Sequence, residues 1–77
     1  MLFEFQLRDD AGEWVTIGTS GTPGDRFDVE EAAVALRDMK GGHLPSGHYR
    51  VRAAELPEPE WMPAEVDDHG VFRRLER

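Results

Sequence analysis

The sequence predicts a small α+β domain with the element order ββαββ, in which one amphipathic helix packs on one face of a mostly antiparallel sheet of four or five strands. Two short runs near the N-terminus alternate apolar and polar residues, which is the period of a strand with one buried face. A later segment carries the start and stop signals of a helix, and further alternating runs follow it. A chain of 77 residues has the length of one domain, so we treat residues 1–77 as a single unit.

The first two strands are predicted to form a hairpin over residues 2–18. In the second strand, Val15 and Ile17 are expected to face the core and Trp14 the opposite side, while the stretch RDDAGEW between the strands supplies Asp and Gly for a turn. Residues 19–27 include two glycines and a proline and are predicted to be an exposed loop. The core residues expected from the first strand are Phe3, Phe5 and Leu7.

The helix is predicted over residues 28–40. Asp28 can accept a hydrogen bond from the first-turn amides, Glu31 completes a capping box, and Phe27 can pack on Ala32 as a hydrophobic staple. Two glycines follow the segment and should end it. Because the apolar stripe is narrow and rich in alanine, the sheet must supply most of the core; the stripe consists of Val29, Ala32, Ala33 and Leu36.

The C-terminal half is predicted to add strands at residues 48–54 and 71–75. In the first of these, Arg50 and Arg52 should face outward, because they alternate with apolar residues. The connection over residues 55–63 is acidic and contains prolines, which lack the N–H group that a central strand needs. Residues 61–66 are therefore expected to form at most a short edge strand.

The segment LPSGHYRVRAA resembles part of the fibronectin type III domains, in which a leucine, a proline and a glycine precede a strand of the form Tyr-x-Val-x-Ala. The matching residues are Leu44, Pro45, Gly47, Tyr49, Val51 and Ala53. The rest of the chain departs from that family, because it is short for a seven-stranded sandwich and places a capped helix directly upstream. We therefore interpret the segment as a turn followed by a strand.

Composition disfavours several classes of function. The formal net charge of −7 disfavours general binding to nucleic-acid backbones, which requires an excess of lysine and arginine. The absence of cysteine excludes disulfides and thiolate metal sites and favours a cytoplasmic location. The sequence contains no run of about 18 apolar residues, which is the length that a membrane-spanning helix would need. Residue usage is typical of a GC-rich genome, which favours a bacterial or phage source.

No pattern of catalytic or metal-binding residues is apparent. The three histidines lack the close spacing of metal ligands, and neither Ser20 nor Ser46 lies in a motif that would activate a nucleophile. We therefore expect no cofactor, no metal and no enzymatic activity.

The candidate binding residues are aromatic and basic. An exposed Trp14 among arginines on the outer side of the sheet could stack on a partner, or it could simply cover its neighbours while the arginines pair with glutamates. For Trp61 we favour a role in closing the core over one as an anchor for a partner. The full set of candidate binding residues is Trp14, Arg50, Arg52, Arg74 and Trp61.

These observations favour a small, non-catalytic module for protein interaction or regulation. Self-association into a homodimer through sheet edges or faces is one version, because a small chain gains much from burying a second surface. One alternative is a nucleic-acid-binding module that uses arginines, including Arg73, together with Trp14. Another is an acidic mimic of nucleic acid that inhibits a partner protein.

Overall fold

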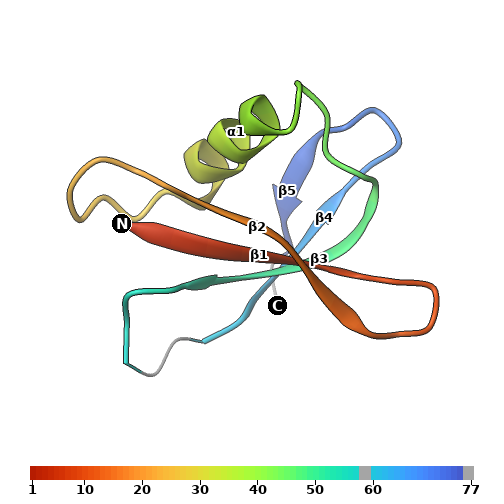
Figure 1. Cartoon of the computed structure of the whole chain (residues 1–77), viewed down its shortest axis with the longest axis horizontal. Coiled ribbons are helices and arrows are strands. Elements are labelled where there is room, and N and C mark those ends of the chain that lie inside the picture. The colour runs from red at the N-terminus through yellow and green to blue at the C-terminus, as the bar shows by residue number, and fades with distance from the viewer. Residues whose placement is uncertain (58–59, 76–77) are drawn as a thin grey trace.

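A computed structural model describes residues 1–57 and 60–75 of the chain. It confirms an α+β fold with one helix packed on one antiparallel sheet in the order ββαββ, with a fifth strand added (Figure 1). The spatial order of the strands is β2-β1-β3-β4-β5. The elements are β1 (Leu2–Arg8), β2 (Trp14–Gly21), α1 (Val29–Met39), β3 (Gly47–Ala53), β4 (Met62–Val66) and β5 (Phe72–Arg74).

A bulge interrupts the hairpin of β1 and β2. Phe5 lies opposite Gly18 and the next residue of β1 lies opposite Thr16, so Ile17 is the extra residue on β2. The prediction that Val15 belongs to the core is wrong, because its side chain is 47% exposed. Val15 lies near the turn of the hairpin, which extends away from α1 in Figure 1, and the helix does not cover it.

Strand β2 continues to Gly21, so the predicted loop over residues 19–27 begins too early. Ser20 is buried, and its hydroxyl donates a hydrogen bond to the carbonyl oxygen of Ala32 in α1. A Cβ atom at Gly21 would lie 2.6 Å from the carbonyl oxygen of Met1. This glycine therefore permits the close approach of two strands and does not form a turn.

The helix begins after Asp28 and ends before two glycines, as predicted, although the Glu31 carboxylate lies 3.3 Å from the Arg26 guanidinium and does not complete the predicted capping box. Asp28 is the N-cap, and its carboxylate accepts a hydrogen bond of 3.0 Å from the backbone N–H of Glu31. At the other end, Gly41 and Gly42 have positive φ angles of 83° and 88°, a conformation that glycine adopts readily. The ring of Phe27 packs edge-on against a core phenylalanine of β1, with 5.3 Å between the centroids.

Strand β4 is not an edge strand, contrary to the prediction, because it pairs with β3 on one side and β5 on the other. The sheet tolerates Pro63 inside β4 for a local reason. The Pro63 carbonyl accepts a hydrogen bond from the N–H of Leu75, so its nitrogen also faces the β5 side. The N–H group that proline lacks would therefore have pointed toward the end of the three-residue strand β5. The hydrogen bonds between β4 and β3 do not need it, so this pairing is kept.

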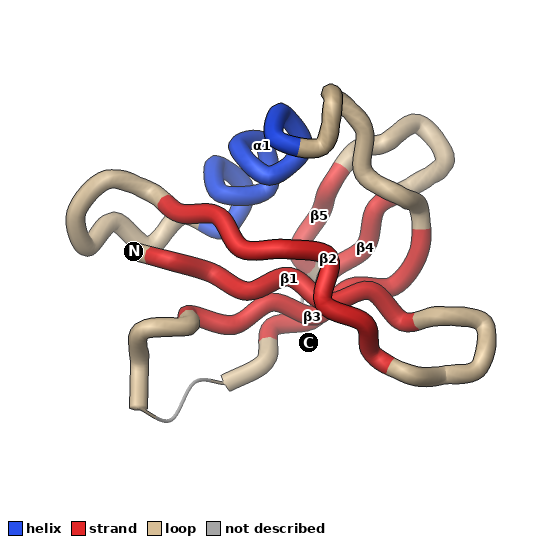
Figure 2. Tube along the Cα trace, viewed as in Figure 1, coloured by secondary structure: helices blue, strands red, loops and turns tan. Residues whose placement is uncertain are grey.

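The core lies between α1 and the inner face of the sheet. Figure 2 shows the helix on one side of the twisted sheet. Burial raises the pKa of the Tyr49 hydroxyl to about 12, and this group donates a hydrogen bond of 2.6 Å to the carbonyl oxygen of Pro45. Within the described residues, no helix is long and apolar enough to cross a membrane. The largest fully buried side chains are Tyr49, Phe3, Phe5, Leu36, Leu44, Val29 and Val51.

Candidate functional site

The side of the sheet opposite α1 carries polar and aromatic side chains. Strand alternation assigns them to this side, because the neighbouring residues in each strand point into the core. We call this surface the outer face. It comprises Glu4, Gln6 and Arg8 of β1, Trp14 and Thr16 of β2, His48, Arg50 and Arg52 of β3, Trp61, Pro63 and Glu65 in or beside β4, and Arg73 of β5.

Arg50 is at the centre of the outer face and contacts both tryptophans. Its guanidinium carbon lies 4.6 Å from the ring centroid of Trp14 and 4.0 Å from that of Trp61. Its Nε donates a hydrogen bond of 2.8 Å to the side-chain oxygen of Gln6. Cation–π contacts of this kind stabilise by about 0.5–1 kcal/mol each at exposed sites. The three side chains therefore form one continuous stack that runs from β2 over β3 to Trp61, the residue before β4.

Arg52 and Glu4 form the second cluster of the outer face. The Nε and one terminal nitrogen of Arg52 each lie 2.7 Å from the same carboxylate oxygen of Glu4. The other oxygen of Glu4 accepts hydrogen bonds of 3.0 Å from Gln6 and from Thr16. Partial burial acts to raise the pKa of Glu4, but the hydrogen bonds from Arg52, Thr16 and Gln6 outweigh it, so the pKa lies below its usual value.

The positive charges of the outer face are unevenly compensated. Arg52 pairs with Glu4, and Arg73 lies 3.1 Å from Glu65. Among the described residues, no carboxylate oxygen lies within 4.0 Å of the guanidinium of Arg8 or Arg50. The outer face thus holds four arginines and two glutamates in a chain whose net charge is −7.

The predicted binding residues do not all lie together. The structure brings Trp14, Arg50, Arg52 and Trp61 into one cluster, but Arg74 lies on the opposite side of the sheet. Arg74 was expected among the outward residues. It pairs with the buried Ala64, whereas its neighbour Arg73 points outward.

The prediction that Trp61 closes the core is also wrong. Val51 lies opposite Met62 in the register of β3 and β4, which directs Met62 inward and the preceding Trp61 outward. Met62 is partly buried against the core, in the position expected for Trp61. The ring of Trp61 instead contacts Arg50 and, at 4.9 Å, the guanidinium of Arg52.

Gln6 is a site residue that the sequence did not single out. It contacts both clusters, because its oxygen accepts from Arg50 and its nitrogen donates to Glu4. Finding it from sequence would have required the pairing of β1 with β3, in which Gln6 lies opposite Arg50 across a long separation in the chain.

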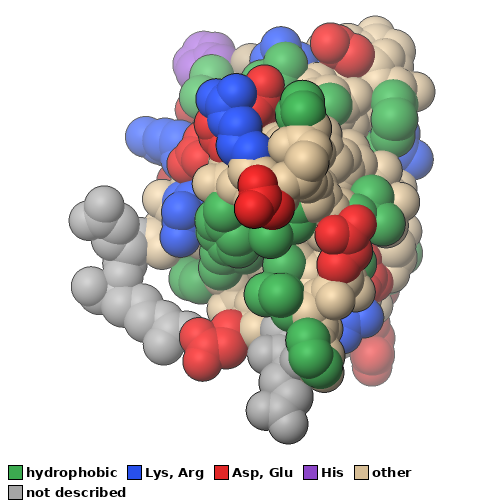
Figure 3. All heavy atoms as spheres, turned by 90° about the vertical axis from the view of Figure 1, so that its left-hand side faces the viewer, with side chains coloured by type: hydrophobic (Ala, Val, Ile, Leu, Met, Phe, Trp, Pro, Cys, Tyr) green, Lys and Arg blue, Asp and Glu red, His purple; other side chains and the backbone are tan. Residues whose placement is uncertain are grey.

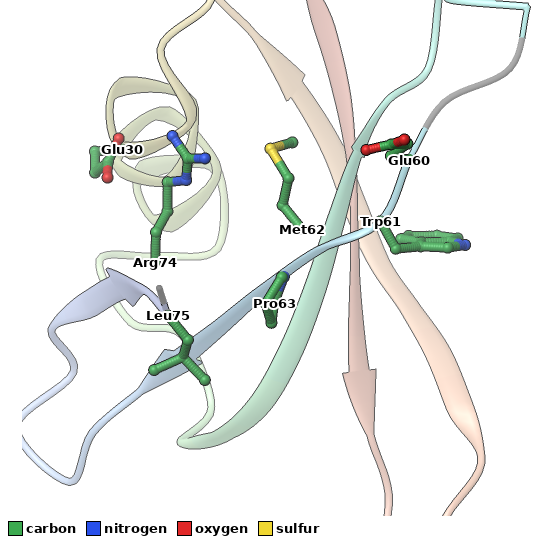
Figure 4. Close-up of a pocket in the computed structure, with 7 residues that line it drawn as sticks. All are labelled: Glu30, Glu60, Trp61, Met62, Pro63, Arg74 and Leu75. Atoms are coloured by element: carbon green, nitrogen blue, oxygen red, sulfur yellow. The ribbon is translucent and has the colours of Figure 1, made fainter. Parts of the chain in front are cut away.

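Two grooves lie around the start of β4, and the first of them also includes Trp61 and Pro63 of the outer face. The first, of about 490 Å³, is lined by Glu30, Glu60, Trp61, Met62, Pro63, Arg74 and Leu75 (Figure 4). The second, also of about 490 Å³, shares three of these residues and adds the half-exposed Phe27 and Leu56. Figure 3 shows hydrophobic side chains gathered at the end of the molecule that carries the N-terminus, with acidic side chains around them.

The polar residues lining these grooves are carboxylates and one guanidinium, a set without a nucleophile or a histidine base. The contacts of Arg50 with Trp14 and Trp61 make the outer face the candidate functional surface.

The three histidines belong to different segments of the fold. His43 follows α1, His48 is on the outer face of β3, and His69 lies in the turn between β4 and β5. In the part of the chain that the structure describes, no group of three or more histidine or acidic side chains is arranged to hold a metal ion.

Comparisons with protein families, with curated proteins and with solved structures gave no significant match. The resemblance of residues 44–54 to fibronectin type III domains thus remains confined to that segment. A function for this chain has to be argued from its geometry.

Proposed function

We propose that this chain is a small, non-catalytic protein-interaction module that binds its partner through the outer face. The observation that carries the proposal is the contact of Arg50 with both Trp14 and Trp61 on a sheet face that no helix covers in the described part of the chain. Tryptophan and arginine dominate the energetic centres of protein interfaces. Side chains that are ordered before binding also lose less conformational entropy when a partner docks.

The hydrogen bonds beneath the tryptophans support this proposal. Gln6 holds Arg50, and Glu4 holds Arg52, so both guanidinium groups are fixed before any partner arrives. Trp14 and Trp61 are both partly exposed at the surface. A partner can therefore gain apolar contact with Trp14 and Trp61 without reorganising the face.

A second candidate function is binding to single-stranded nucleic acid, which Arg8 and Arg50 favour. Both guanidinium groups lack a carboxylate partner among the described residues, and both flank Trp14, so phosphates and a stacked base could be bound together. The net charge of −7 opposes this function. Binding of this kind would weaken steeply as the salt concentration rises.

Affinity capture with matched variants tests the proposed function. The bait proteins are the parent chain, Trp14→Ala, Arg50→Ala, and Met39→Ala, whose exposed side chain lies at the end of α1. We expect a partner protein that the parent and Met39→Ala retain and that both outer-face variants lose. Thermal melts check that each bait is folded.

Two results would contradict the proposal. If Trp14→Ala and Arg50→Ala retain the same proteins as the parent, the outer face is not the binding surface. If only labelled oligothymidylate binds, and salt abolishes this binding, the nucleic-acid function replaces the protein-binding one.

A further inference from the structure

The side of α1 that faces β5 exposes an apolar strip. Val34 is 46% exposed and Val71 is 50% exposed. They line a pocket of about 170 Å³, which is on the scale of an apolar cavity of about 150 Å³ that can hold a benzene ring. We call this surface the α1/β5 seam. Its residues are Glu30, Ala33, Val34, Arg37, Val71 and Phe72.

The charges of the seam are arranged in a self-complementary way. Glu30 lies one turn before Val34 in α1, and Arg37 lies about one turn after it. Glu30 and Arg37 are about 10 Å apart along the helix axis, at a rise of 1.5 Å per residue, which is too far for a mutual ion pair. Within residues 1–57 and 60–75, neither side chain makes an ion pair.

A two-fold axis at Val34 would satisfy both charges. Two copies of α1 packed antiparallel about that axis place Glu30 of one copy near Arg37 of the other, and the symmetry repeats the pair. The same operation brings the two Val34 side chains together and sets the pocket of each copy against the apolar strip of the other.

We propose that a second copy of this chain docks on the α1/β5 seam and forms a symmetric homodimer. The charge pattern favours a second copy over an unrelated partner. Glu30 and Arg37 lie four residues before and three residues after Val34, a nearly symmetric spacing that only a two-fold arrangement would require. The outer face stays open in such a dimer, so each dimer presents two copies of it. The proposal does not depend on the proposed function.

The interface is expected to be weak. Two chains of net charge −7 repel each other, and the two ion pairs are exposed. A standard interface buries about 800 Å² per partner, which would be about a sixth of the 4996 Å² surface of this chain. We therefore expect association in the micromolar range and a loss of dimer on dilution.

A charge-exchange experiment tests the geometry. Sedimentation velocity of the parent chain over the micromolar range should show a monomer–dimer equilibrium. Glu30→Arg presents two arginines on the seam and Arg37→Glu presents two glutamates, so each variant alone should dimerise about tenfold less tightly, because two attractions become repulsions.

An equimolar mixture of the two variants should recover the dimer. In the mixed dimer, the arginine introduced at position 30 of one chain faces the glutamate introduced at position 37 of the other. The second contact is again the parental pair, with Arg37 of the first chain facing Glu30 of the second. Both contacts are therefore attractive only when the two variants meet.

The control is Glu13→Arg, which makes the same charge change in the turn between β1 and β2, away from the seam. It should dimerise like the parent. Thermal melts identify any variant that loses its fold, and a reversed charge near a helix end lowers the stability of the helix modestly.

Three outcomes would overturn the proposal. A parent chain that stays monomeric at the highest soluble concentration excludes the dimer. A dimer that tolerates both single variants uses another surface. Failure of the mixture to recover dimer, with both variants folded, excludes the antiparallel arrangement.

Discussion

The guanidinium carbon of Arg50 lies 4.0 Å from the centroid of the Trp61 ring, and this contact joins the two sides of the acidic, proline-containing connection between β3 and β4. The connection leaves β3 after Ala53 and returns as β4 beside the same strand. Trp61 therefore covers the outer face where the chain rejoins the sheet. The stack stabilises the return of the chain as well as offering a surface to a partner.

Replacing Trp61 by alanine should distinguish this role from a role in the core. Loss of the two cation–π contacts with Arg50 and Arg52 is expected to cost about 1–2 kcal/mol in the free energy of unfolding. Removal of a buried tryptophan from a core would cost about 3–5 kcal/mol. Urea denaturation of Trp61→Ala measures the difference. A cost in the higher range would show that Trp61 is needed by the core.

The hydrogen bonds to Glu4 should make stability depend on pH. Because the pKa of Glu4 in the folded chain lies below its unfolded value, the carboxylate stabilises the fold above the unfolded pKa, and this contribution is lost as the pH falls through the folded pKa. Glu4→Gln should therefore be less stable than the parent at neutral pH and should approach the parent in acid. Melting temperatures across an acid titration test this, and a difference that does not change with pH would refute it.

A matched cycle separates the ion pair from the rest of the network around Glu4. Arg52→Gln should lower the free energy of unfolding at neutral pH. The double variant, Glu4→Gln with Arg52→Gln, should lose less stability than the two single variants lose in sum, because either change alone already breaks the ion pair. Additive costs would mean that Thr16 and Gln6, rather than Arg52, provide the stabilisation by hydrogen bonding to Glu4.

The sequence predicted the elements whose signals are local. The N-cap Asp28 and the glycines after α1 identify the helix without knowledge of any distant residue. The alternation in β3 placed Arg50 and Arg52 outward correctly, since Tyr49 and Val51 beside them are buried. These features depend on side-chain period and on caps, which act over a few neighbouring residues.

The two errors within the candidate site arose because a shift of one residue in strand register changes the face on which a side chain lies. Side chains alternate with a period of two, so a shift of one position exchanges the faces. This is why Arg73, rather than Arg74, points outward, and why Met62, rather than Trp61, reaches the core. The bulge at Ile17 shifts the pairing of β2 in the same way, and the only local indication of it is the neighbouring Gly18, because an isolated glycine inside a strand can mark a bulge.

Asp28→Ala should lower stability without affecting the outer face. The change removes the acceptor for the Glu31 amide and a negative charge at the start of α1, at a cost of about 0.5–2 kcal/mol. The outer face is on the opposite side of the sheet, so the folded variant should bind a partner like the parent. Asp25→Ala is the control, because it removes an exposed acid from the preceding loop. Equal melting temperatures for Asp28→Ala and the parent would contradict the capping role.

Gly21→Ala should be more damaging than Gly18→Ala, although both changes add one methyl group to β2. The new Cβ at Gly21 would lie 2.6 Å from the carbonyl oxygen of Met1, and the nearest other atoms are also backbone atoms. The backbone of β1 cannot rotate away as a side chain can, so the two strands must separate there, at a cost of about 1–3 kcal/mol.

At Gly18 the new Cβ would lie 2.9 Å from a terminal carbon of the Leu36 side chain, and the end of a side chain can shift by a few tenths of an ångström more readily than backbone can. Gly18→Ala should therefore destabilise the chain less, and the pair serves as its own control because the substitution is the same. Urea denaturation of both variants beside the parent measures the two costs. If Gly21→Ala is as stable as the parent, the close approach of Met1 to the end of β2 does not constrain the fold, and the position of this edge strand has to be revised.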